Sequence, residues 1–556
     1  MSEREQLQRA CGVSPVTVVT AKRPDWYTVS GLAYTTVAGV PGIQVASDGR
    51  LELHRSHMPL IADVTPAWDA VGVTLRNRLH AERATFDART AQHDWILRAY
   101  QHEAREFILG RKGAFIGDQP RLGKTAEIVS AHELSDGPLV VVGPIAARAV
   151  WINWFAKRWP DVAPVVVRGK RYSPEAVTTV RGEQIPLGQA QLVFLNYDIL
   201  STWQFYGRAG IGTLVFDEPH VLSNRRSNRS EAALVISSRA ERIVLATGTP
   251  LWNRPAGLWT LLSTVNPGAW GKWFPFAERY CAGHPGAWGY EANGASNVEE
   301  FRARLAEVFL RRTWREVRPE LPSTERTIET VEISEAQGYD LEVAAFALRE
   351  AAGSGTVIGA LARFRRLLGA HKVKAAVEAA CRVLDNDESV VVWAWHRDVV
   401  AKTAQELQRR GYRALTMTGE DDGTVREAVV ATFASEGRGN PIALVATIGV
   451  GQTAIDLSAA RHCVFVEVDF TPAVISQAEM RTFSPDRPMT VCYIVAEHEI
   501  DRMLVETLSE KCALAERMGL PAADTPVEVI GAALGVQLDE GDLSRLQAVF
   551  LEEDFA

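Results

Sequence analysis

The stretch GDQPRLGKTAE, at residues 117–127, holds the residue types with the clearest chemical use. It follows the apolar run GAFIGD and precedes a helical pattern, which is the context of a phosphate-binding loop. In such a loop, backbone N–H groups and a helix N-terminus hold phosphates, a lysine reaches the β and γ oxygens, and a hydroxyl binds Mg²⁺. Gly123, Lys124 and Thr125 are the candidates for these roles. The strict pattern G-x-x-x-x-G-K-[ST] is not met, because position 118 is Asp; Asp118 is grouped with the nucleotide-binding candidates.

A second constellation, TLVFDEPH at residues 213–220, is an apolar run that ends in two acids. In parallel sheets, ligands bind at the carboxyl ends of the strands. Asp217 at such an end can hold Mg²⁺, and Glu218 can orient or deprotonate an attacking water. A surface strand end with two acids is the alternative interpretation, and a GKT string alone also occurs by chance. Within one α/β domain, however, the two motifs together favour a nucleoside triphosphate hydrolase.

The elements that would position these residues follow from the apolar runs. From about residue 95, short runs bounded by Gly, Pro, Asp or Asn alternate with helical stretches. Near-continuous Val, Ile and Leu runs indicate strands of parallel sheets that helices cover on both faces. The sequence therefore predicts two tandem α/β domains, residues 95–325 and 355–512. The runs lie at 113–118, 139–144, 191–198, 213–219 and 242–250, and then at 389–396, 442–447, 462–469 and 490–497.

The two ends of the chain carry less recognisable chemistry. Residues 1–90 read as a small mixed segment, with strand-like patterns at 16–21 and around Trp26–Tyr34 and a partly helical pattern at 61–88. Residues 513–556 read as a helical, acidic tail. No run approaches the roughly 18 apolar residues of a membrane span, so we expect no membrane contact.

Cysteine usage and the first residues bear on the compartment. The six cysteines are scattered and form no C-x-x-C pair, which argues against a zinc site or a disulfide framework and suits a reducing cytosol. The start, MSEREQLQRACG, lacks the basic-then-apolar order of a secretory signal. We expect a cytoplasmic location, and the compact length inclines us towards a bacterial or phage-infected host.

The net charge of −8 requires any nucleic-acid surface to be local, because phosphate backbones are bound by basic groups. Two stretches are candidates for such a surface, and a solvated helix face is the alternative for each. The first stretch holds Arg302, Arg304, Arg311, Arg312, Arg315 and Arg318, and the second holds Arg363, Arg365, Arg366, Lys372 and Lys374.

Further motifs make a family resemblance specific. LRAYQHEAREFIL (97–109), the DEPH string and LATGTP (245–250), taken with the loop above, resemble the Swi/Snf-type branch of the superfamily 2 helicases. The resemblance covers roughly residues 95–512. It implies two RecA-like P-loop lobes with parallel sheets, a DEAH box at DEPH, and an ATP and Mg²⁺ site with Gln101 on its adenine side. The residues that would couple this site to nucleic acid are Thr247, Gly248 and Thr249.

A narrower resemblance points to DNA as the polymer. Residues 276–322 are similar to a stretch of the annealing-helicase (HARP-type) group, whose members rewind DNA and remodel forks; the RYC, GASN and LRR-to-LP blocks occur in order. Arg225 and Arg226 follow the DEPH string, as the basic continuation does in this family. We expect them to contact the phosphate backbone, with an exposed loop as the alternative.

The segment QAEMRTFSPDR (477–487) resembles the motif that closes on ATP from the second lobe, but departs from it. Gln477 and Arg481 match the family pattern, whereas the second arginine position is Ser484. That arginine usually serves as the finger on the γ-phosphate, worth roughly 10³–10⁵ in rate. Arg487 could substitute for it if the segment is helical, although Pro485 and Pro488 oppose a helix. The first-lobe loop also has Arg121 where the family usually has Gly.

For several conspicuous side chains we expect structural roles and no chemistry. Trp151 is expected to pack a helix, and Trp393 and Trp395 are expected to lie in the core on one strand face. His220 is expected to bridge the lobes and not to perform acid–base chemistry.

The sequence thus predicts a DNA-dependent ATPase of the helicase or translocase type that acts, most simply as a monomer, on double-stranded or forked DNA. Lys124 and Thr125 would hold phosphates and Mg²⁺, Asp217 and Glu218 the metal and water, and Arg481 with Arg487 would close from the other lobe. Two alternatives stay open: an ATP-gated or weakly active DNA-binding clamp or recruitment protein, and a remodeller of protein–DNA complexes that meets replication or repair proteins.

Overall fold

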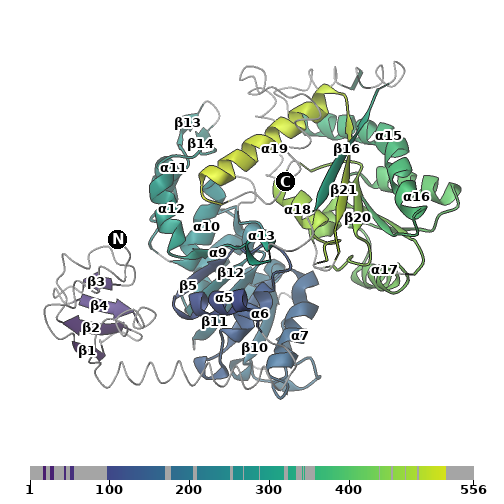
Figure 1. The fold of residues 1–556 in the computed structure, drawn as a ribbon. Coiled ribbons are helices and arrows are strands. Elements are labelled where there is room, and N and C mark those ends of the chain that lie inside the picture. The colour runs from purple at the N-terminus through teal and green to yellow at the C-terminus, as the bar shows by residue number, and fades with distance from the viewer. Residues whose placement is uncertain are drawn as a thin grey trace.

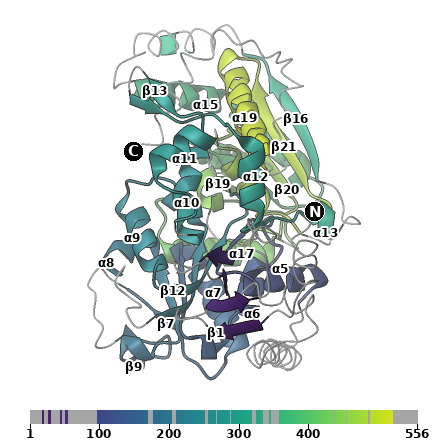
Figure 2. The same ribbon diagram turned by 90° about the vertical axis from the view of Figure 1, so that its left-hand side faces the viewer.

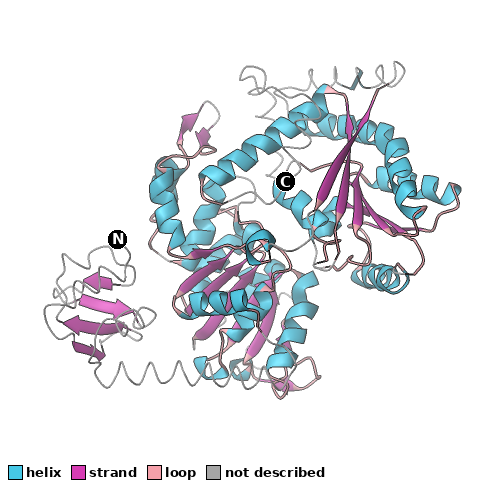
Figure 3. Cartoon of the chain, in the orientation of Figure 1, coloured by secondary structure: helices cyan, strands magenta, loops and turns pink. Residues whose placement is uncertain are grey.

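The computed structural model describes four short segments, residues 17–20, 26–30, 43–45 and 51–54, and then residues 97–520. Within the latter range it leaves out 169–176, 204–209, 251–254, 267, 287–288, 319–323, 334–340, 342, 345–356, 438, 453–454, 470 and 485–486. Two α/β lobes make up most of the described chain, each with a central sheet and helices on both sides (Figures 1 and 3).

Lobe 1 is built on a seven-stranded sheet in which every paired neighbour is parallel. The order is β15-β5-β12-β11-β6-β10-β7. All residues of β5 and β6 are buried, as expected for strands covered on both faces. The strands are β5 (Gly113–Ile116), β6 (Leu139–Gly143), β7 (Val165–Val166), β10 (Leu192–Asn196), β11 (Ile211–Asp217), β12 (Ala240–Ala246) and β15 (Phe309–Leu310).

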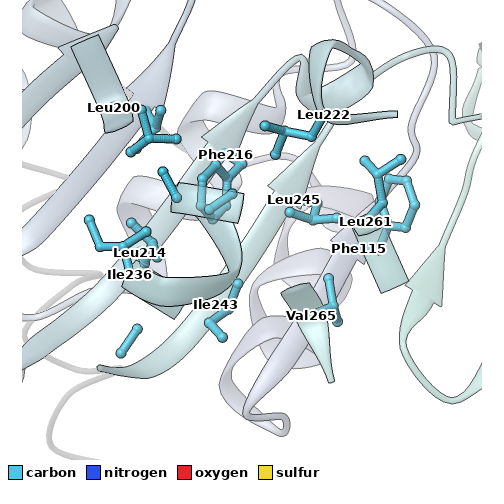
Figure 4. Packing of buried hydrophobic residues seen from close by; sticks show 14 of the residues in the cluster. Phe115, Leu200, Leu214, Phe216, Leu222, Ile236, Ile243, Leu245, Leu261 and Val265 are labelled. Atoms are coloured by element: carbon cyan, nitrogen blue, oxygen red, sulfur yellow. The ribbon is translucent and has the colours of Figure 1, made fainter. Parts of the chain in front are cut away.

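Two apolar layers cover the faces of this sheet, because successive side chains of a strand point to opposite sides. Phe115 joins one layer, while its neighbours Ala114 and Ile116 join the other. Figure 4 shows part of the first layer, in which Phe216 and Leu245 of adjacent strands meet helix residues. The helices of lobe 1 are α5 (Ala99–Leu109), α6 (Lys124–Ser130), α7 (Arg148–Arg158), α8 (Leu200–Trp203), α9 (Asn228–Ser237), α10 (Leu258–Val265), α11 (Trp273–Tyr280), α12 (Val298–Ala306) and α13 (Trp314–Val317).

Lobe 2 repeats the architecture with a six-stranded parallel sheet of order β16-β21-β20-β17-β19-β18. Its strands are β16 (Glu325–Val331), β17 (Val390–Ala394), β18 (Ala414–Met417), β19 (Ala443–Thr447), β20 (His462–Phe465) and β21 (Thr490–Ala496). Its helices are α15 (Val357–Leu384), α16 (Arg397–Arg409), α17 (Gly423–Glu436), α18 (Pro472–Glu479) and α19 (Glu499–Arg517).

The expected boundaries between the lobes need correction. β16 begins at Glu325 and pairs with β21, so the sheet of lobe 2 starts about where we expected lobe 1 to end, and well before residue 355. The polar strand ERTIETV lacks a continuous apolar run because it lies at the sheet edge and is only half-buried. Its place in the sheet depends on a partner strand that is distant in sequence.

The predicted tail boundary at residue 513 falls inside α19, which is a single helix from Glu499 to Arg517. After the helix, Met518 and Leu520 are fully buried in the apolar layer of lobe 1. Arg302 of α12 donates to the backbone carbonyl of Glu516. Both ribbon views show α19 running from lobe 2 back to the helices of lobe 1 (Figures 1 and 2). The rest of the expected tail, 521–556, lies outside the described residues.

The N-terminal segment contributes an antiparallel sheet of order β1-β2-β4-β3, formed by Thr17–Thr20, Trp26–Ser30, Leu51–His54 and Ile43–Val45. The strand-like patterns at 16–21 and at Trp26 are confirmed, while the helical pattern at 61–88 lies outside the described residues. Two small hairpins complete the strands: β8 (Val177–Thr178) with β9 (Gln184–Ile185), and β13 (His284–Gly286) with β14 (Gly289–Glu291). Within the part of the chain that the structure describes, no helix is both long and apolar enough to cross a membrane.

Candidate active site

The loop between β5 and α6 has the form expected of a phosphate-binding loop. Lys124 is the first residue of α6, and Gly123 before it adopts a left-handed backbone with φ of 98°. This positive φ favours glycine, and a Cβ at Gly123 would also lie 2.3 Å from Nε2 of Gln101 and displace that side chain. Gln101 in turn donates from Nε2 to the carbonyl of Leu122 at 3.0 Å. The helix N-terminus and Gln101, the residue expected on the adenine side, therefore lie next to each other.

Lys124 folds its ammonium over this loop. Nζ donates to the carbonyl oxygens of Asp118 at 2.8 Å and Gln119 at 3.4 Å. Burial lowers the pKa of Lys124, while the charges of Glu218 and Asp118 oppose that shift. The lysine therefore lies within electrostatic range of the acid pair.

The acids Asp217 and Glu218 stand at the carboxyl end of β11, which one strand separates from β5, the strand before the loop. β12 lies between β5 and β11, so Thr247 after β12 lies between the loop and the acids. Burial, and then the charge of Glu218, raise the pKa of Asp217 to about 7. Trp151 donates from Nε1 to Oδ2 of Asp217 at 2.8 Å, so this buried tryptophan orients a carboxylate in addition to packing its helix.

Glu218 has the opposite environment from its neighbour. Its backbone is left-handed, with φ of 49°, and Thr247 donates from Oγ1 to Oε2 at 2.6 Å. Burial acts to raise the pKa of Glu218, but His220, Lys124 and Thr247 together hold it below the ordinary value. Nδ1 of His220 lies 3.6 Å from Oε2 of Glu218, so this histidine accompanies the acid.

The TGT segment after β12 connects the acids to lobe 2. Gly248 allows close approach of the loop, because a Cβ there would lie 2.7 Å from the ring of Pro120. Oγ1 of Thr249 lies 3.3 Å from Oγ1 of Thr247 and accepts from Nε2 of Gln477 at 3.1 Å. A continuous set of hydrogen bonds thus runs from Glu218 through the two threonines to α18 of lobe 2.

Arg481 presents the charge of lobe 2 to this site. Its Nε donates to the carbonyl of Gly451 at 2.7 Å. Burial lowers the pKa of Arg481 to about 10, and the nearby charges of Glu218 and Asp217 oppose that shift. The prediction that Arg481 faces the acid pair from the second lobe agrees with this arrangement.

Arg487 does not take the predicted finger role. α18 ends at Glu479, and the following chain forms a bridge between Ser484 and Arg487 instead of the helix that the role requires. The guanidinium of Arg487 donates to the carbonyl of Ser458, within lobe 2, at 2.5 Å. Among the described residues of lobe 2, the arginine that lines the cleft is Arg481.

A cavity of about 520 Å³ opens between the lobes beside the loop. Lobe 1 contributes the loop and the α5 segment, and lobe 2 contributes the segments before and within the last motif. Its lining residues include Tyr100, Gln101, Arg121, Gly123, Ile455, Asp456 and Arg481. Of the predicted site residues, Gln101 and Gly123 of lobe 1 and Arg481 of lobe 2 line this nucleotide-sized space.

Asp118 differs from its predicted role as a nucleotide contact. Its carboxylate is fully buried, and both oxygens accept from Arg312, with Nε at 3.1 Å from Oδ2. The same guanidinium reaches Oε1 of Glu127 at 2.9 Å and the carbonyl of Tyr100. Asp118 thus supports the loop from behind. Sequence reasoning counted Arg312 as a surface base and missed its function; the recurrence of the LRR-to-LP block was the available signal.

The basic stretches are also largely engaged within the protein. Arg311 donates to the carbonyls of Gly117 and Gly248, at 2.9 and 3.2 Å. Lys372 forms a buried ion pair with Asp501. Further members pair with neighbours: Arg302 with Glu516, Arg304 with Tyr280 and Ala269, Arg365 with Val468, and Arg366 with Asp398.

The two arginines after the DEPH string, Arg225 and Arg226, have different surroundings. Arg225 stacks on Trp273, with its guanidinium carbon 4.1 Å from the ring centroid, whereas Arg226 is exposed. The two tryptophans near the end of β17 also differ in burial. Trp393 is fully buried as predicted, but Trp395 lies beyond the end of β17 with 40% of its surface exposed, which corrects the expected core position.

The protein groups present fit a magnesium ion held mainly by phosphate and water. Mg²⁺ in nucleotide sites usually keeps one or two protein oxygen ligands. Thr125, in the first turn of α6, and Asp217 supply a hydroxyl and a carboxylate of that kind. Within the described part of the chain, no cluster of three or more His, Cys, Asp or Glu side chains offers an all-protein metal site.

A P-loop and acid pair on one RecA-like lobe, with an arginine presented by a second, define the class of two-lobed helicase-like proteins. The SNF2-related domain family matches residues 80–348, and the helicase conserved C-terminal domain family matches residues 375–485. The chain belongs to the Swi/Snf-type helicase-like proteins, a family that uses a nucleotide.

Named relatives narrow the branch. The chain is 26% identical over 440 residues to SWI/SNF-related matrix-associated actin-dependent regulator of chromatin subfamily A-like protein 1 of Xenopus tropicalis, covering 77% of this chain and 45% of the relative. It is 25% identical over 515 residues to the human DNA annealing helicase and endonuclease ZRANB3, covering 89% of this chain and 44% of that protein. The chain thus spans under half the length of these two relatives.

A solved structure of the Sulfolobus solfataricus SWI2/SNF2 ATPase core in complex with dsDNA is 18% identical and covers 81% of this chain and 96% of that one. The TM-score is 0.36. A similarity of this size does not identify the fold by itself, so the fold is identified by the strand orders of the two sheets.

Proposed function

We propose that the chain is an ATP-hydrolysing motor that tracks along or remodels double-stranded or branched DNA. The observation that carries the proposal is the cleft itself. Lys124 of lobe 1 and Arg481 of lobe 2 both lie within electrostatic range of the acid pair, and the Thr249–Gln477 hydrogen bond links the two lobes. The names of the relatives, which include a DNA annealing helicase, support DNA as the polymer.

In this mechanism the loop N–H groups and Lys124 hold the phosphates, and Gln101 lies on the base side. Bound Mg²⁺ would neutralise charge on the phosphate oxygens, held by Thr125 and Asp217. Glu218, whose pKa lies below the ordinary value, stays ionised near neutral pH and can orient the attacking water. Arg481 stabilises developing charge from the opposite side of the cleft.

Coupling to DNA would run through the threonine bridge. A change at Glu218 reaches Thr247 directly and Gln477 through Thr249, so the state of the acid affects how lobe 2 sits on lobe 1. Repeated closure and reopening would move the lobes along a backbone. Contacts of that kind give weak sequence preference and a strong dependence on salt. Arg226 is exposed and suits such a contact.

One observation favours a second candidate function, an ATP-gated DNA clamp with slow turnover. Ser484 carries no charge, and Arg487 is bonded to Ser458 instead of facing the cleft. A cleft with a single lobe-2 arginine would bind ATP and close without a large rate enhancement.

Steady-state ATP hydrolysis decides between these functions. Turnover is measured without nucleic acid and with single-stranded, duplex and forked DNA or RNA, for wild type, Glu218→Gln and Lys124→Ala. Glu241→Gln, an exposed acid on the neighbouring strand of lobe 1, is the matched control. A motor is stimulated by duplex or forked DNA and loses turnover in both site variants.

The other outcomes are equally informative. ATP binding with no hydrolysis on any polymer would replace the motor by the clamp. Wild-type turnover in Lys124→Ala would show that the site has been assigned to the wrong residues.

A further inference from the structure

Arg121 has an unusual conformation for its residue type. It lies in the middle of the phosphate-binding loop with φ of 68°, in the left-handed region that favours glycine. For a side chain with a Cβ this conformation costs about 1–2 kcal/mol. Such a residue persists where its surroundings fix it, so its contacts indicate what the conformation is for.

Among the described residues, the hydrogen-bond partners of the Arg121 side chain lie in lobe 2. The guanidinium donates to the carbonyl of Phe483 at 2.7 Å, to the carbonyl of Arg481 at 3.0 Å and to Oδ1 of Asp456 at 2.7 Å. Asp456 is itself fixed, since Oδ1 also accepts from the backbone N–H of Ser458 at 2.9 Å. One side chain of the loop thus bonds to two residues shortly before Ser484, Arg481 and Phe483, and to Asp456 in an earlier segment of lobe 2.

The rest of this junction is apolar and continuous with the same loop. Leu122, directly after the arginine, is 1% exposed and is buried in the apolar cluster of lobe 2. Trp314 of lobe 1 packs on Phe483, with ring centroids 5.1 Å apart. Tyr100 donates from its hydroxyl to the carbonyl of Leu122 at 2.9 Å. The outer side of the nucleotide loop is therefore part of the interface between the lobes.

We propose that Arg121 is a positioning residue that latches lobe 2 onto the phosphate-binding loop and so holds Arg481 against the acid pair. It acts through the backbone of Arg481 and Phe483, and it supplies at this junction a guanidinium that Ser484 cannot. A movement of the loop on nucleotide binding or release would pass directly to lobe 2. The inference rests on the proposed function for its catalytic consequence, but the latch itself is a statement about lobe arrangement.

The test uses the full chain and three variants. Arg121→Gly removes the latch and suits the left-handed backbone, so the loop is expected to fold. Arg121→Lys keeps the charge but loses the planar fork, and Asp456→Asn keeps the shape but loses the charge. Arg413→Ala, which breaks an exposed ion pair with Glu436 on the surface of lobe 2, is the control.

Three quantities are measured. The distance between lobes is followed by energy transfer between probes on unnatural side chains at the exposed positions Ser238 and Ser435. Nucleotide affinity is measured with a fluorescent ATP analogue, and turnover is measured on duplex DNA at saturating ATP. We expect Arg121→Gly to lengthen the mean distance and lower kcat about tenfold, the effect of losing one charge-assisted contact, with the affinity changed less than about threefold. For Arg121→Lys and Asp456→Asn, the mean distance and kcat should lie between the values of Arg121→Gly and wild type.

Two results would overturn the latch. Unchanged distance and kcat in Arg121→Gly would show that the three hydrogen bonds do not hold the lobes. A large loss of affinity with unchanged distance and kcat would make Arg121 a nucleotide contact instead. If wild type hydrolyses no ATP, the proposed motor fails, yet the distance measurement still confirms or rejects the latch.

Discussion

At the scale of single residues, the two carboxylates after β11 show how environment divides adjacent acids. Asp217 is buried beside a second negative charge, which raises its pKa to about 7, whereas Glu218 is surrounded by donors that hold its pKa down. The first suits a group that gains from a bound cation, and the second suits a group that must stay ionised to act on water. The short hydrogen bond from Thr247 is one cause of that difference.

Thr247→Val removes that hydroxyl with little change in shape. Loss of the donor raises the pKa of Glu218, so the acidic limb of the turnover–pH profile should move to higher pH, with turnover at pH 7 lowered about fivefold. Thr264→Val, which removes a buried hydroxyl that bonds within α10, is the control. An acidic limb at the wild-type position would mean that Thr247 does not tune Glu218.

A second residue-scale prediction concerns stability and acid. His132 is fully buried against Thr213, and burial lowers its pKa to about 3 from an ordinary 6.5. Between these two pKa values, His132 is protonated in the unfolded chain but neutral in the folded chain. The stability that depends on a neutral His132 is complete above pH 6.5 and declines as the pH falls towards 3, by about 1.4 kcal/mol per pH unit.

His132→Asn should flatten this part of the dependence, as followed by urea unfolding between pH 4 and 7. The slope is compared with that of His284→Asn, whose imidazole is exposed. An unchanged slope in His132→Asn would assign the acid sensitivity to other groups.

At the scale of elements, Arg312 shows that a basic stretch can be internal structure. It follows β15 and joins the start of α5, the loop and α6 through Tyr100, Asp118 and Glu127. The pair Asp118 and Arg312 is separated by 194 positions in the sequence, so charge counting alone placed this arginine on the surface.

Arg312→Ala would leave two buried carboxylates without their cation. Breaking a buried pair from one side costs about 3–5 kcal/mol, and we expect a loss of that size in the free energy of unfolding. Arg279→Ala, which breaks an exposed pair with Glu300, should change stability little. Denaturant unfolding of both variants makes the comparison, and equal losses would contradict a structural role for Arg312.

At the scale of the whole molecule, α19 joins the end of lobe 2 to the core of lobe 1. Met518 and Leu520 are buried among lobe 1 residues, so the segment after α19 packs against the first lobe. The arrangement restricts how far the lobes can separate, in addition to the contacts in the cleft.

Met518→Ala should therefore destabilise lobe 1 although it lies beyond lobe 2 in the sequence. Truncating a buried methionine costs about 2–5 kcal/mol. Hydrogen exchange would show faster opening in α10 and α12, whereas Glu516→Ala at an exposed neighbouring position would not. Protection in lobe 1 equal to wild type would mean that the end of α19 does not belong to its core.

The sequence by itself determined the features that depend on neighbouring residues. Continuous apolar runs bounded by turn residues placed the buried strands of both sheets, because a strand covered on both faces needs no polar alternation. A strand, a glycine loop with Lys124 and a helix start placed the phosphate site, and a strand ending in Asp217 and Glu218 placed the acids. β16 was missed because, half-exposed at a sheet edge, it carries no such run.

Only the tertiary structure decided which charges serve the cleft and which support it. Asp118 is held by Arg312 and Arg487 is held by Ser458, so neither takes its predicted role, whereas Arg121, 362 positions from Phe483, bonds to the opposite lobe. The strength of an ionic contact depends on distance and burial, and neither quantity is a property of local sequence. Residue type and spacing identify the groups able to do chemistry, and folding selects their partners.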